Sequence, residues 1–370
     1  MKLTSGFANI LKNSTASVKK NTGVSVGFHD PDTWISTGNY ALNYRMTTDF
    51  HKGVPLGKVA MLSGQSGSGK SFIASGNIVR EAQKQGIFVV LIDSENALDE
   101  DWLHALGVDT SEDKLLKVNM GMINDVAKFT YEFIDGYRKE YSDVPREDRQ
   151  KVLFVVDSIG FLSVPAAVDQ FKTGDLKGDM GIKAKQLKAY ITQCVNSFGD
   201  LNIGMVCVNH SYESQDMFNP DPKISGGQGL VYACSMVVAM SQLKLKEDTD
   251  GNKTSEVNGI RAICKVMKSR YAKPHETVEI KIPWDTGMNP YSGLVEMFEK
   301  YNLLTKSGNR LTYTDIDTGE QIIKYRKAWQ SNEDQCLDLI MNQFHRNPLI
   351  TPVSEEEKGD ESFGVEPDVE

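Results

Sequence analysis

Five short apolar runs with almost no polar interruption recur between residues 58 and 241. In chain order they read KVAMLS, IFVVLID, KVLFVVDS, IGMVCVN and SMVVAMS, and segments of helical length separate them. A strand with one exposed face alternates apolar and polar side chains, whereas a continuous apolar run is buried on both faces. The pattern therefore predicts an α/β fold with a mostly parallel central sheet that helices cover.

Two later segments, EVNGIRAICKVMKSR and ETVEIKIP, alternate apolar and polar residues more regularly. Alternation with a period of two is typical of half-buried strands. We expect these segments to add antiparallel strands to the sheet.

The two ends of the chain differ from this core in composition. Residues 1–33 are polar, with a small apolar cluster at helical spacing and a turn-rich connector, and predict a short N-terminal helical arm that contacts its own body or a neighbouring protomer. Residues 34–290 contain the predicted strands and form the core domain. Residues 291–350 mix helical patterns with turns and predict a small α+β C-terminal domain, and residues 351–370 predict an acidic disordered tail.

The net charge of −9 argues at first against a nucleic-acid partner, because phosphate binding requires Lys and Arg at the contact surface. The last 17 residues hold eight acidic residues and one Lys, so the rest of the chain carries only −2. The five cysteines are widely spaced without a CxxC pair, which favours buried thiols over disulfides or a zinc site. No segment approaches the ~18 consecutive apolar residues of a membrane span, and we expect a cytoplasmic protein without a membrane partner.

The apolar run KVAMLS leads directly into GQSGSGKSF, which fits the G-x-x-x-x-G-K-[ST] pattern of a phosphate-binding loop. Glycines let backbone N–H groups curl around the β-phosphate, Lys70 reaches the β and γ oxygens, and the Ser71 hydroxyl binds Mg²⁺. A helical segment follows at once, and the N-terminus of a helix favours anions. The predicted ATP-binding residues of this loop are Gly64, Gln65, Ser66, Gly67, Ser68, Gly69, Lys70, Ser71 and Phe72.

Two acidic residues follow predicted strands. KVLFVVDS carries Asp157, which we predict to hold Mg²⁺ together with Ser71, although an acid at this position can also be a simple helix cap. ATP hydrolysis further requires a group that orients the attacking water. In FVVLIDSENALD the strand carries Asp93 and then Glu95, and the spacing alone leaves Glu95 either as that group or as a surface acid.

An ordered set of segments resembles the RecA family of homologous recombinases over roughly residues 34–300. The segments are WISTGNYALNYRM, GVPLGKVAMLSGQSGSGKS, LIDSENALDEDWLHALGVD, VLFVVDSIGFL, GDMGIKAKQLKAYI and SGGQGLVYACS. VNHSYESQDMF and WDTGMNPYSGL look most similar to the phage UvsX type. The resemblance implies a RecA-type ATPase core.

Further site residues follow only from this resemblance. It implies that Glu95 is the catalytic carboxylate that activates water. It places His210 as the γ-phosphate sensor, where the bacterial pattern carries Gln, and an imidazole can donate a hydrogen bond to a phosphate oxygen. It also implies that Lys268 and Arg270, in CKVMKSRYAKP, complete the ATP site of a neighbouring protomer. An exposed basic strand end is the alternative for these two residues.

The family binds DNA through two mobile loops, which the resemblance places within residues 170–188 and 211–229. The first segment is rich in Lys and Gly, although a solvated helix start has the same composition. The second contains Pro and Gly without periodicity, and its aromatic and Met side chains suit stacking on bases of any sequence. The predicted DNA-binding residues are Lys172, Lys177, Lys183, Lys185, Tyr212, Met217, Phe218, Gly226 and Gly227.

The resemblance therefore implies an ATP- and Mg²⁺-dependent recombinase that polymerises as a helical filament on single-stranded DNA and pairs it with homologous double-stranded DNA. A single-strand-binding protein and a recombination mediator or loader are expected partners, in the host cytoplasm if the chain is phage-encoded. A replicative DNA helicase on the same core is the main alternative. A small-molecule kinase and a DNA-coating protein without turnover are weaker alternatives.

Overall fold

The structure is a computed structural model that describes Asn9, Lys12 and residues 30–174, 181–212, 222–248 and 252–347. The chain divides into two compact units, residues 1–292 and 293–370. Most of the predicted N-terminal arm and all of the predicted acidic tail lie outside the described residues. Among the described residues, no helix is long and apolar enough to cross a membrane.

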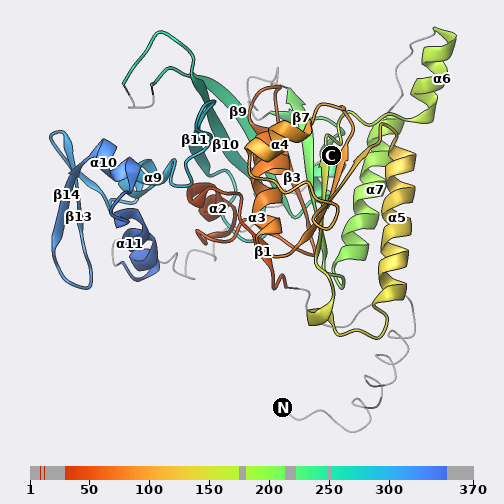
Figure 1. The fold of residues 1–370 in the computed structure, drawn as a ribbon, viewed down its shortest axis with the longest axis horizontal. Helices are drawn as coiled ribbons and strands as arrows, with labels where there is room; N and C mark the ends of the chain where they lie inside the picture. Colours follow the sequence, from red (N-terminus) through yellow and green to blue (C-terminus); the bar gives the residue numbers. More distant parts are fainter. Residues whose placement is uncertain are drawn as a thin grey trace, which may run out of the picture. The chain divides into compact units, whose positions relative to one another are not determined.

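The first unit is built on one large sheet whose strands follow the spatial order β11-β10-β9-β3-β7-β6-β4-β5, with β8 pairing β7 off this path (Figure 1). In this spatial order, every pair of neighbouring strands from β9 to β5 is parallel. Strand β10 pairs antiparallel with both β9 and β11. The strands are β3 (Val59–Gly64), β4 (Phe88–Asp93), β5 (Leu115–Asn119), β6 (Val152–Asp157), β7 (Ile203–Tyr212), β8 (Lys223–Ile224), β9 (Met236–Leu245), β10 (Gly259–Ser269) and β11 (Thr277–Pro283).

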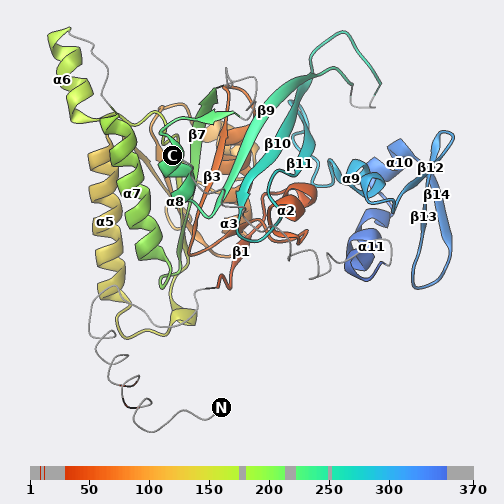
Figure 2. The same ribbon diagram turned by 180° about the vertical axis from the view of Figure 1, so that it is seen from behind.

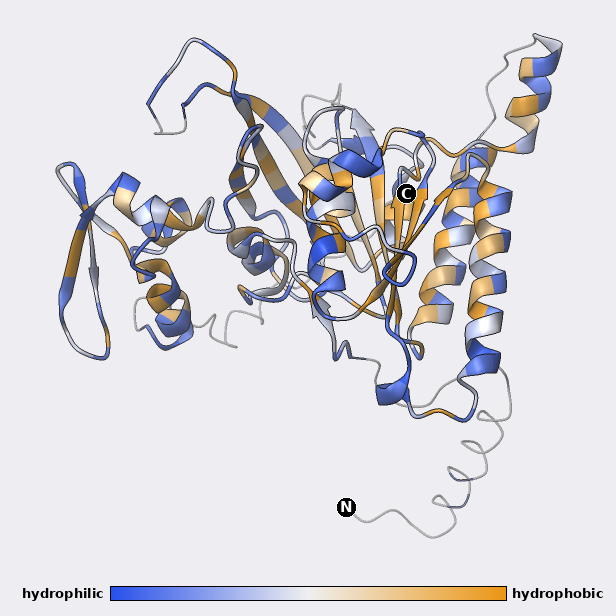
Figure 3. Ribbon diagram, in the orientation of Figure 1, coloured by the Kyte–Doolittle hydropathy of each residue, from blue (hydrophilic) through white to orange (hydrophobic). Residues whose placement is uncertain are grey.

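The predicted mostly parallel sheet with antiparallel additions is confirmed. The five apolar runs are strands because their side chains are buried on both faces, as all six residues of β3 and of β6 are. Figure 3 shows the hydrophobic colour concentrated in these central strands. The strand β5 was missed, because only its first residue is buried and its LLKVN sequence lacks both patterns.

Helices α5 (Ile123–Glu140) and α7 (Ile182–Phe198) lie side by side in Figures 1 and 2 and pack on the sheet. The main hydrophobic core includes Val126 from α5, Ile191 from α7 and Phe154 from β6. The remaining elements of the first unit are β1 (Trp34–Ile35), α2 (Tyr40–Thr47), β2 (Val54–Pro55), the π-helix η1 (Phe72–Ile78), α3 (Val79–Gln83), α4 (Glu100–Ala105), the 3-10 helix η2 (Arg146–Asp148), α6 (Pro165–Thr173) and α8 (Gln228–Ala233).

The register of the parallel strands brings their carboxyl ends to one edge of the sheet. Gly64 of β3 pairs with His210 of β7, and Asp93 of β4 pairs with Asp157 of β6. In open α/β sheets, ligands bind at this edge. The predicted catalytic and phosphate-binding residues are therefore brought together by the order and register of the strands.

The second unit is a small α+β domain, as predicted. A three-stranded antiparallel sheet of order β12-β13-β14 accompanies short helices, and Trp329, Tyr313 and Phe344 fill its core. Its elements are α9 (Leu294–Lys300), β12 (Thr305–Ser307), β13 (Arg310–Thr314), β14 (Gln321–Tyr325), α10 (Arg326–Ser331), α11 (Cys336–Gln343) and the 3-10 helix η3 (Phe344–Arg346).

Candidate nucleotide-binding and catalytic site

The segment from Gly64 to Ser71 forms a tight loop between β3 and η1, and its glycines are required by geometry. Gly67 and Gly69 have φ angles of +75° and +88°, a region that favours glycine. A Cβ atom on Gly64 would lie 2.3 Å from the carbonyl oxygen of Met240. The loop therefore has the compact backbone that a phosphate-binding loop requires.

Lys70 lies inside this loop rather than in solvent. Its side chain is 6% exposed, and its ammonium donates a hydrogen bond of 2.6 Å to the carbonyl oxygen of Gln65. Burial lowers the pKa of Lys70, and the negative charges of Asp157 and Glu95 oppose that shift. The loop thus holds a cation where the phosphates of a nucleotide would lie.

Asp157 and Ser71, the predicted magnesium residues, lie next to each other. Asp157 is 4% exposed and accepts a hydrogen bond of 2.7 Å from the Ser75 hydroxyl. Burial raises the pKa of Asp157, and hydrogen bonds from Ser75 and Ser71 oppose that shift. One hydroxyl and one buried carboxylate beside a phosphate loop fit Mg²⁺, which takes few protein ligands when phosphate oxygens and water supply the rest.

The raised pKa of Asp157 has a consequence for stability. A group whose pKa is higher in the folded state stabilises the fold fully below its unfolded pKa, and that stabilisation is lost as the pH rises through the folded pKa. At neutral pH the carboxylate therefore destabilises the nucleotide-free protein. We expect Asp157→Asn to raise the nucleotide-free melting temperature by about 2 °C while reducing the further rise caused by Mg²⁺ and ATP. A variant that melts lower without nucleotide would contradict this.

Glu95, Ser158 and His210 form a compact polar cluster beside the phosphate loop. Ser158 donates a hydrogen bond of 2.6 Å from its hydroxyl to Glu95 Oε1. His210 Nε2 lies 3.2 Å from the same oxygen and 3.3 Å from Ser158 Oγ. The side chains of Glu95 and His210 are 30% and 37% exposed, so both are accessible to a ligand. Glu95 is therefore a member of an organised site and not an isolated surface acid.

Two neighbouring residues, Asp93 and Ser94, hold Glu95 in place. The Asp93 carboxylate accepts hydrogen bonds from the backbone N–H groups of Glu95 and Leu98, at 3.1 and 3.0 Å. The Ser94 hydroxyl donates to the Ser158 carbonyl oxygen at 2.7 Å and accepts from the Ser158 N–H at 3.0 Å. The sequence alone does not indicate a role for Ser94 or Ser158, because the contacts that define their roles join segments far apart in the chain.

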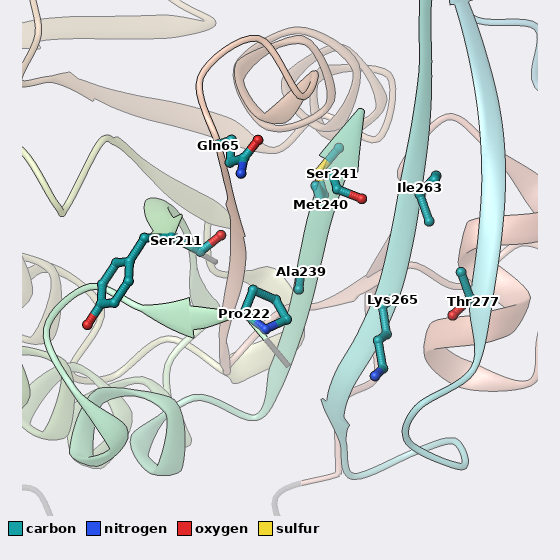
Figure 4. A pocket seen from close by; sticks show the side chains of 10 residues that line it. Gln65, Ser211, Pro222, Ala239, Met240, Ser241, Ile263, Lys265 and Thr277 are labelled. Carbon is teal, nitrogen blue, oxygen red and sulfur yellow. The ribbon is translucent and has the colours of Figure 1, made fainter. Parts of the chain in front are cut away.

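A cavity of about 260 Å³ lies beside the phosphate loop. Figure 4 shows Gln65 of that loop beside Met240 and Ser241 of β9. Ser211, Tyr212 and Pro222, which flank the undescribed residues 213–221, also line the cavity, and the remaining lining residues are Ala239, Ile263, Lys265 and Thr277. The cavity therefore adjoins both the phosphate loop and the base of the predicted second DNA loop.

The predicted DNA-binding residues have different environments. Lys172 and Lys185 are exposed, and Tyr212 is 58% exposed at the end of β7. The ammonium of Lys183 instead donates a hydrogen bond of 2.6 Å to the carbonyl oxygen of Gly160. Three of the predicted residues lie outside the described residues, namely Lys177, Met217 and Phe218.

Gly226 and Gly227 lie where the chain enters α8. Their φ angles are +88° and +79°, and Gly227 immediately precedes the first residue of the helix. A Cβ atom on Gly226 would lie 3.0 Å from Leu230 Cδ2. Backbone conformation and packing therefore account for both glycines, and DNA contact by them stays a prediction.

Lys268 and Arg270 lie away from the phosphate loop of their own protomer. The partner of Lys268 on β9 is Val237, and the partner of Gly64 on the same strand is Met240. At ~3.3 Å per residue, these two partners lie roughly 10 Å apart along β9. The Lys268 ammonium donates to the carbonyl oxygens of Val231 and Tyr232 at the end of α8. Burial lowers the pKa of Lys268, and the charge of Arg270 adds to that shift.

The sheet order, the glycine-rich loop and the acidic residues at the strand ends define a phosphate-loop nucleotide-binding protein of the α/β class. The profile of the RecA N-terminal domain family matches residues 23–289. The chain therefore belongs to the RecA family, which confirms the resemblance seen in its motifs.

Curated relatives agree with this membership over most of their lengths. The chain is 25% identical over 355 residues to the "Recombination and repair protein" of Enterobacteria phage T4, covering 92% of this chain and 83% of the relative. It is 27% identical over 366 residues to "Protein RecA" of Clostridium botulinum, covering 96% and 92% of the two chains. It is 27% identical over 310 residues to "Protein RecA" of Arthrobacter, covering 82% and 80%.

Proposed function

We propose that this chain is a DNA-dependent ATPase that assembles on single-stranded DNA with other copies of itself and pairs that strand with homologous duplex DNA. Membership of the RecA family supports the recombinase assignment, and the names of the relatives concern recombination and repair. The observation that carries the mechanism is the cluster of Glu95, Ser158 and His210 beside the buried Lys70. Neither the family match nor the relatives named above favour a helicase.

The same site suggests how ATP would be hydrolysed. Lys70 and the N–H groups of the loop bind the phosphates, and Ser71 and Asp157 would hold Mg²⁺, which neutralises phosphate charge when bound. Glu95 orients a water molecule and accepts its proton as the water attacks the γ-phosphorus. Ser158 keeps the Glu95 carboxylate turned toward the site through their 2.6 Å hydrogen bond. These roles favour turnover over a purely DNA-coating function.

His210 is well placed to connect the nucleotide with DNA. It lies beside Glu95 on β7, and the same strand continues through Tyr212 to the predicted second DNA loop. The Ser225 N–H, on the far side of that segment, donates to the His210 carbonyl oxygen at 2.9 Å. A γ-phosphate that draws the imidazole away from Glu95 therefore shifts both ends of the segment. ATP binding would thus switch the protein to its state of higher DNA affinity.

The switch predicts a specific defect in a His210→Ala variant. Wild-type protein is expected to bind a single-stranded oligonucleotide at least about tenfold more tightly with ATP than with ADP, and the variant is expected to lose that difference. Fluorescence anisotropy with labelled DNA measures both affinities, and Tyr131→Ala, an exposed change on α5, is the control. A His210→Ala protein that keeps the full difference between ATP and ADP would contradict the switch.

Lys268 and Arg270 are proposed to act on the ATP site of a neighbouring protomer. Their distance from the phosphate loop of their own protomer supports this. The two side chains could reach that loop, roughly 10 Å away along the strands, only if the sheet refolded. A cation supplied by a neighbour stabilises charge in the transition state and makes hydrolysis depend on assembly. To reach a neighbour, the Lys268 ammonium must exchange its two α8 carbonyl partners for phosphate oxygens.

This arrangement predicts complementation between two inactive variants. Glu95→Gln disables the site of its own protomer, and Lys268→Ala with Arg270→Ala disables the site of the neighbour. Random assembly of an equimolar mixture leaves about a quarter of the interfaces intact, so up to about a quarter of the wild-type ATPase rate should return. If the mixture is no more active than its components, the two residues do not act between protomers.

Further partners and domain roles are part of the same proposal. The N-terminal arm, residues 1–33, would contact a neighbouring protomer, and the C-terminal unit would accompany the core, residues 34–290, on DNA. A single-strand-binding protein and a mediator or loader would act with the filament. ATP and Mg²⁺ are the proposed cofactors.

A further inference from the structure

Lys183 and Lys185 are two lysines of the predicted first DNA loop, and their side chains differ in what they contact. Lys183 is the second residue of α7, is half-buried, and donates a hydrogen bond of 2.6 Å to the carbonyl oxygen of Gly160. Lys185, two positions further along the helix, is exposed. The Lys183 ammonium therefore joins the first turn of α7 to the segment that follows β6.

Gly160 in turn lies directly against the end of β7. A Cβ atom at this position would lie 2.6 Å from Asn209 Oδ1 and 3.2 Å from His210 Cδ2. The N–H group of the preceding residue, Ile159, donates to the Val208 carbonyl oxygen at 2.8 Å. Since close-packed groups transmit displacement, a shift of Gly160 must be taken up by Asn209 and His210.

The contacts continue from there to the catalytic carboxylate. His210 Nε2 lies 3.2 Å from Glu95 Oε1, and the ring of Phe161 lies with its centroid 6.2 Å from that of His210. An uninterrupted series of contacts therefore runs from the start of α7 through Gly160 and His210 to Glu95. Energetic coupling between two sites is carried by contiguous networks of this kind.

We propose that Lys183 is a positioning residue that transmits DNA binding at the start of α7 to Glu95, and that it is not a DNA ligand. The inference rests on the proposed DNA-dependent ATPase function. DNA phosphates attract the exposed Lys185 and displace the first turn of α7, and Lys183 moves Gly160 with it. His210 then changes its position relative to Glu95, which alters the ability of the carboxylate to orient water.

The test compares DNA affinity with the maximal DNA-stimulated ATPase rate in the full chain. Lys183→Met keeps an unbranched stem but removes the donor, Lys183→Arg restores a donor, and Lys185→Met is the matched change on the same helix. We expect Lys183→Met to bind a single-stranded oligonucleotide within about twofold of wild type, while kcat at saturating DNA falls about tenfold with little change in the KM for ATP. Lys183→Arg should recover most of that rate. Lys185→Met should require more DNA for half-maximal stimulation, because it removes a contact with DNA phosphates and leaves the Lys183 donor in place.

Three results would overturn the proposal. Weaker DNA binding by Lys183→Met with an intact maximal rate would make Lys183 a DNA ligand. If Lys183→Met matches wild type in both DNA affinity and maximal rate, Lys183 does not couple DNA binding to hydrolysis. The same conclusion follows if Lys183→Met loses the maximal rate and Lys183→Arg, with a wild-type melting temperature, fails to recover it. A wild-type chain without DNA stimulation would instead contradict the proposed function itself.

Discussion

Replacing Lys70 by alanine is expected to reduce ATP turnover by roughly 10³-fold. The buried ammonium is the cation that the loop holds for the β and γ oxygens, and its hydrogen bond to the Gln65 carbonyl oxygen keeps it inside the loop. Phosphate release under saturating ATP and DNA measures the rate.

Stability measurements separate this effect from unfolding. Burial already lowers the pKa of Lys70, so the folded protein disfavours its charged form, and its removal should leave the nucleotide-free melting temperature close to that of wild type. The rise in melting temperature that ATP causes should be lost. Lys84→Ala, an exposed change at the C-terminal end of α3, is the matched control and should keep both activity and the ATP-dependent rise. Substantial turnover by Lys70→Ala would exclude the phosphate loop as the ATP site.

Glu95→Gln is expected to lower the hydrolysis rate by about 10² to 10⁴-fold while ATP-dependent DNA binding persists. Glutamine has the size of glutamate and keeps an oxygen that accepts the hydrogen bond from Ser158, but it cannot accept a proton from water. The variant should therefore hold DNA for longer in ATP than wild type does. Single-turnover ATP hydrolysis and the lifetime of labelled DNA complexes measure the two properties.

The matched control for this change is Glu100→Gln, since Glu100 is exposed on α4. Its hydrolysis rate should stay within about twofold of wild type. A Glu95→Gln protein that keeps more than a tenth of the wild-type rate would show that another group orients the water.

Much of the first unit could be predicted because burial leaves a direct mark on the sequence. The phosphate-loop strand and the Asp157 strand are continuous apolar runs, since each lies between neighbours in a covered sheet. The strand Leu115–Asn119 could not be found in this way, because it lies at the edge of the sheet with one buried residue. Helix α2 was also missed, although Asn39, which accepts a hydrogen bond from the Leu42 N–H, is a typical helix cap.

The candidate site was only partly predictable. The phosphate loop is local in sequence, so its residues and their roles follow from one motif. The meeting of Glu95, Ser158 and His210 depends on the order of three strands, which neither spacing nor composition specifies. Lysine content likewise places Lys183 with the DNA-binding residues, whereas its contact with Gly160 is visible only in the folded chain.

We propose that ATP binding in this chain drives homologous pairing of DNA. Joint-molecule formation tests it most directly, with a single-stranded oligonucleotide, a supercoiled duplex, ATP and Mg²⁺, alongside a heterologous oligonucleotide and the Lys70→Ala protein. Product is expected only with the homologous oligonucleotide and the intact Lys70. Product with the heterologous oligonucleotide, or unwinding of a forked duplex without any pairing, would contradict it.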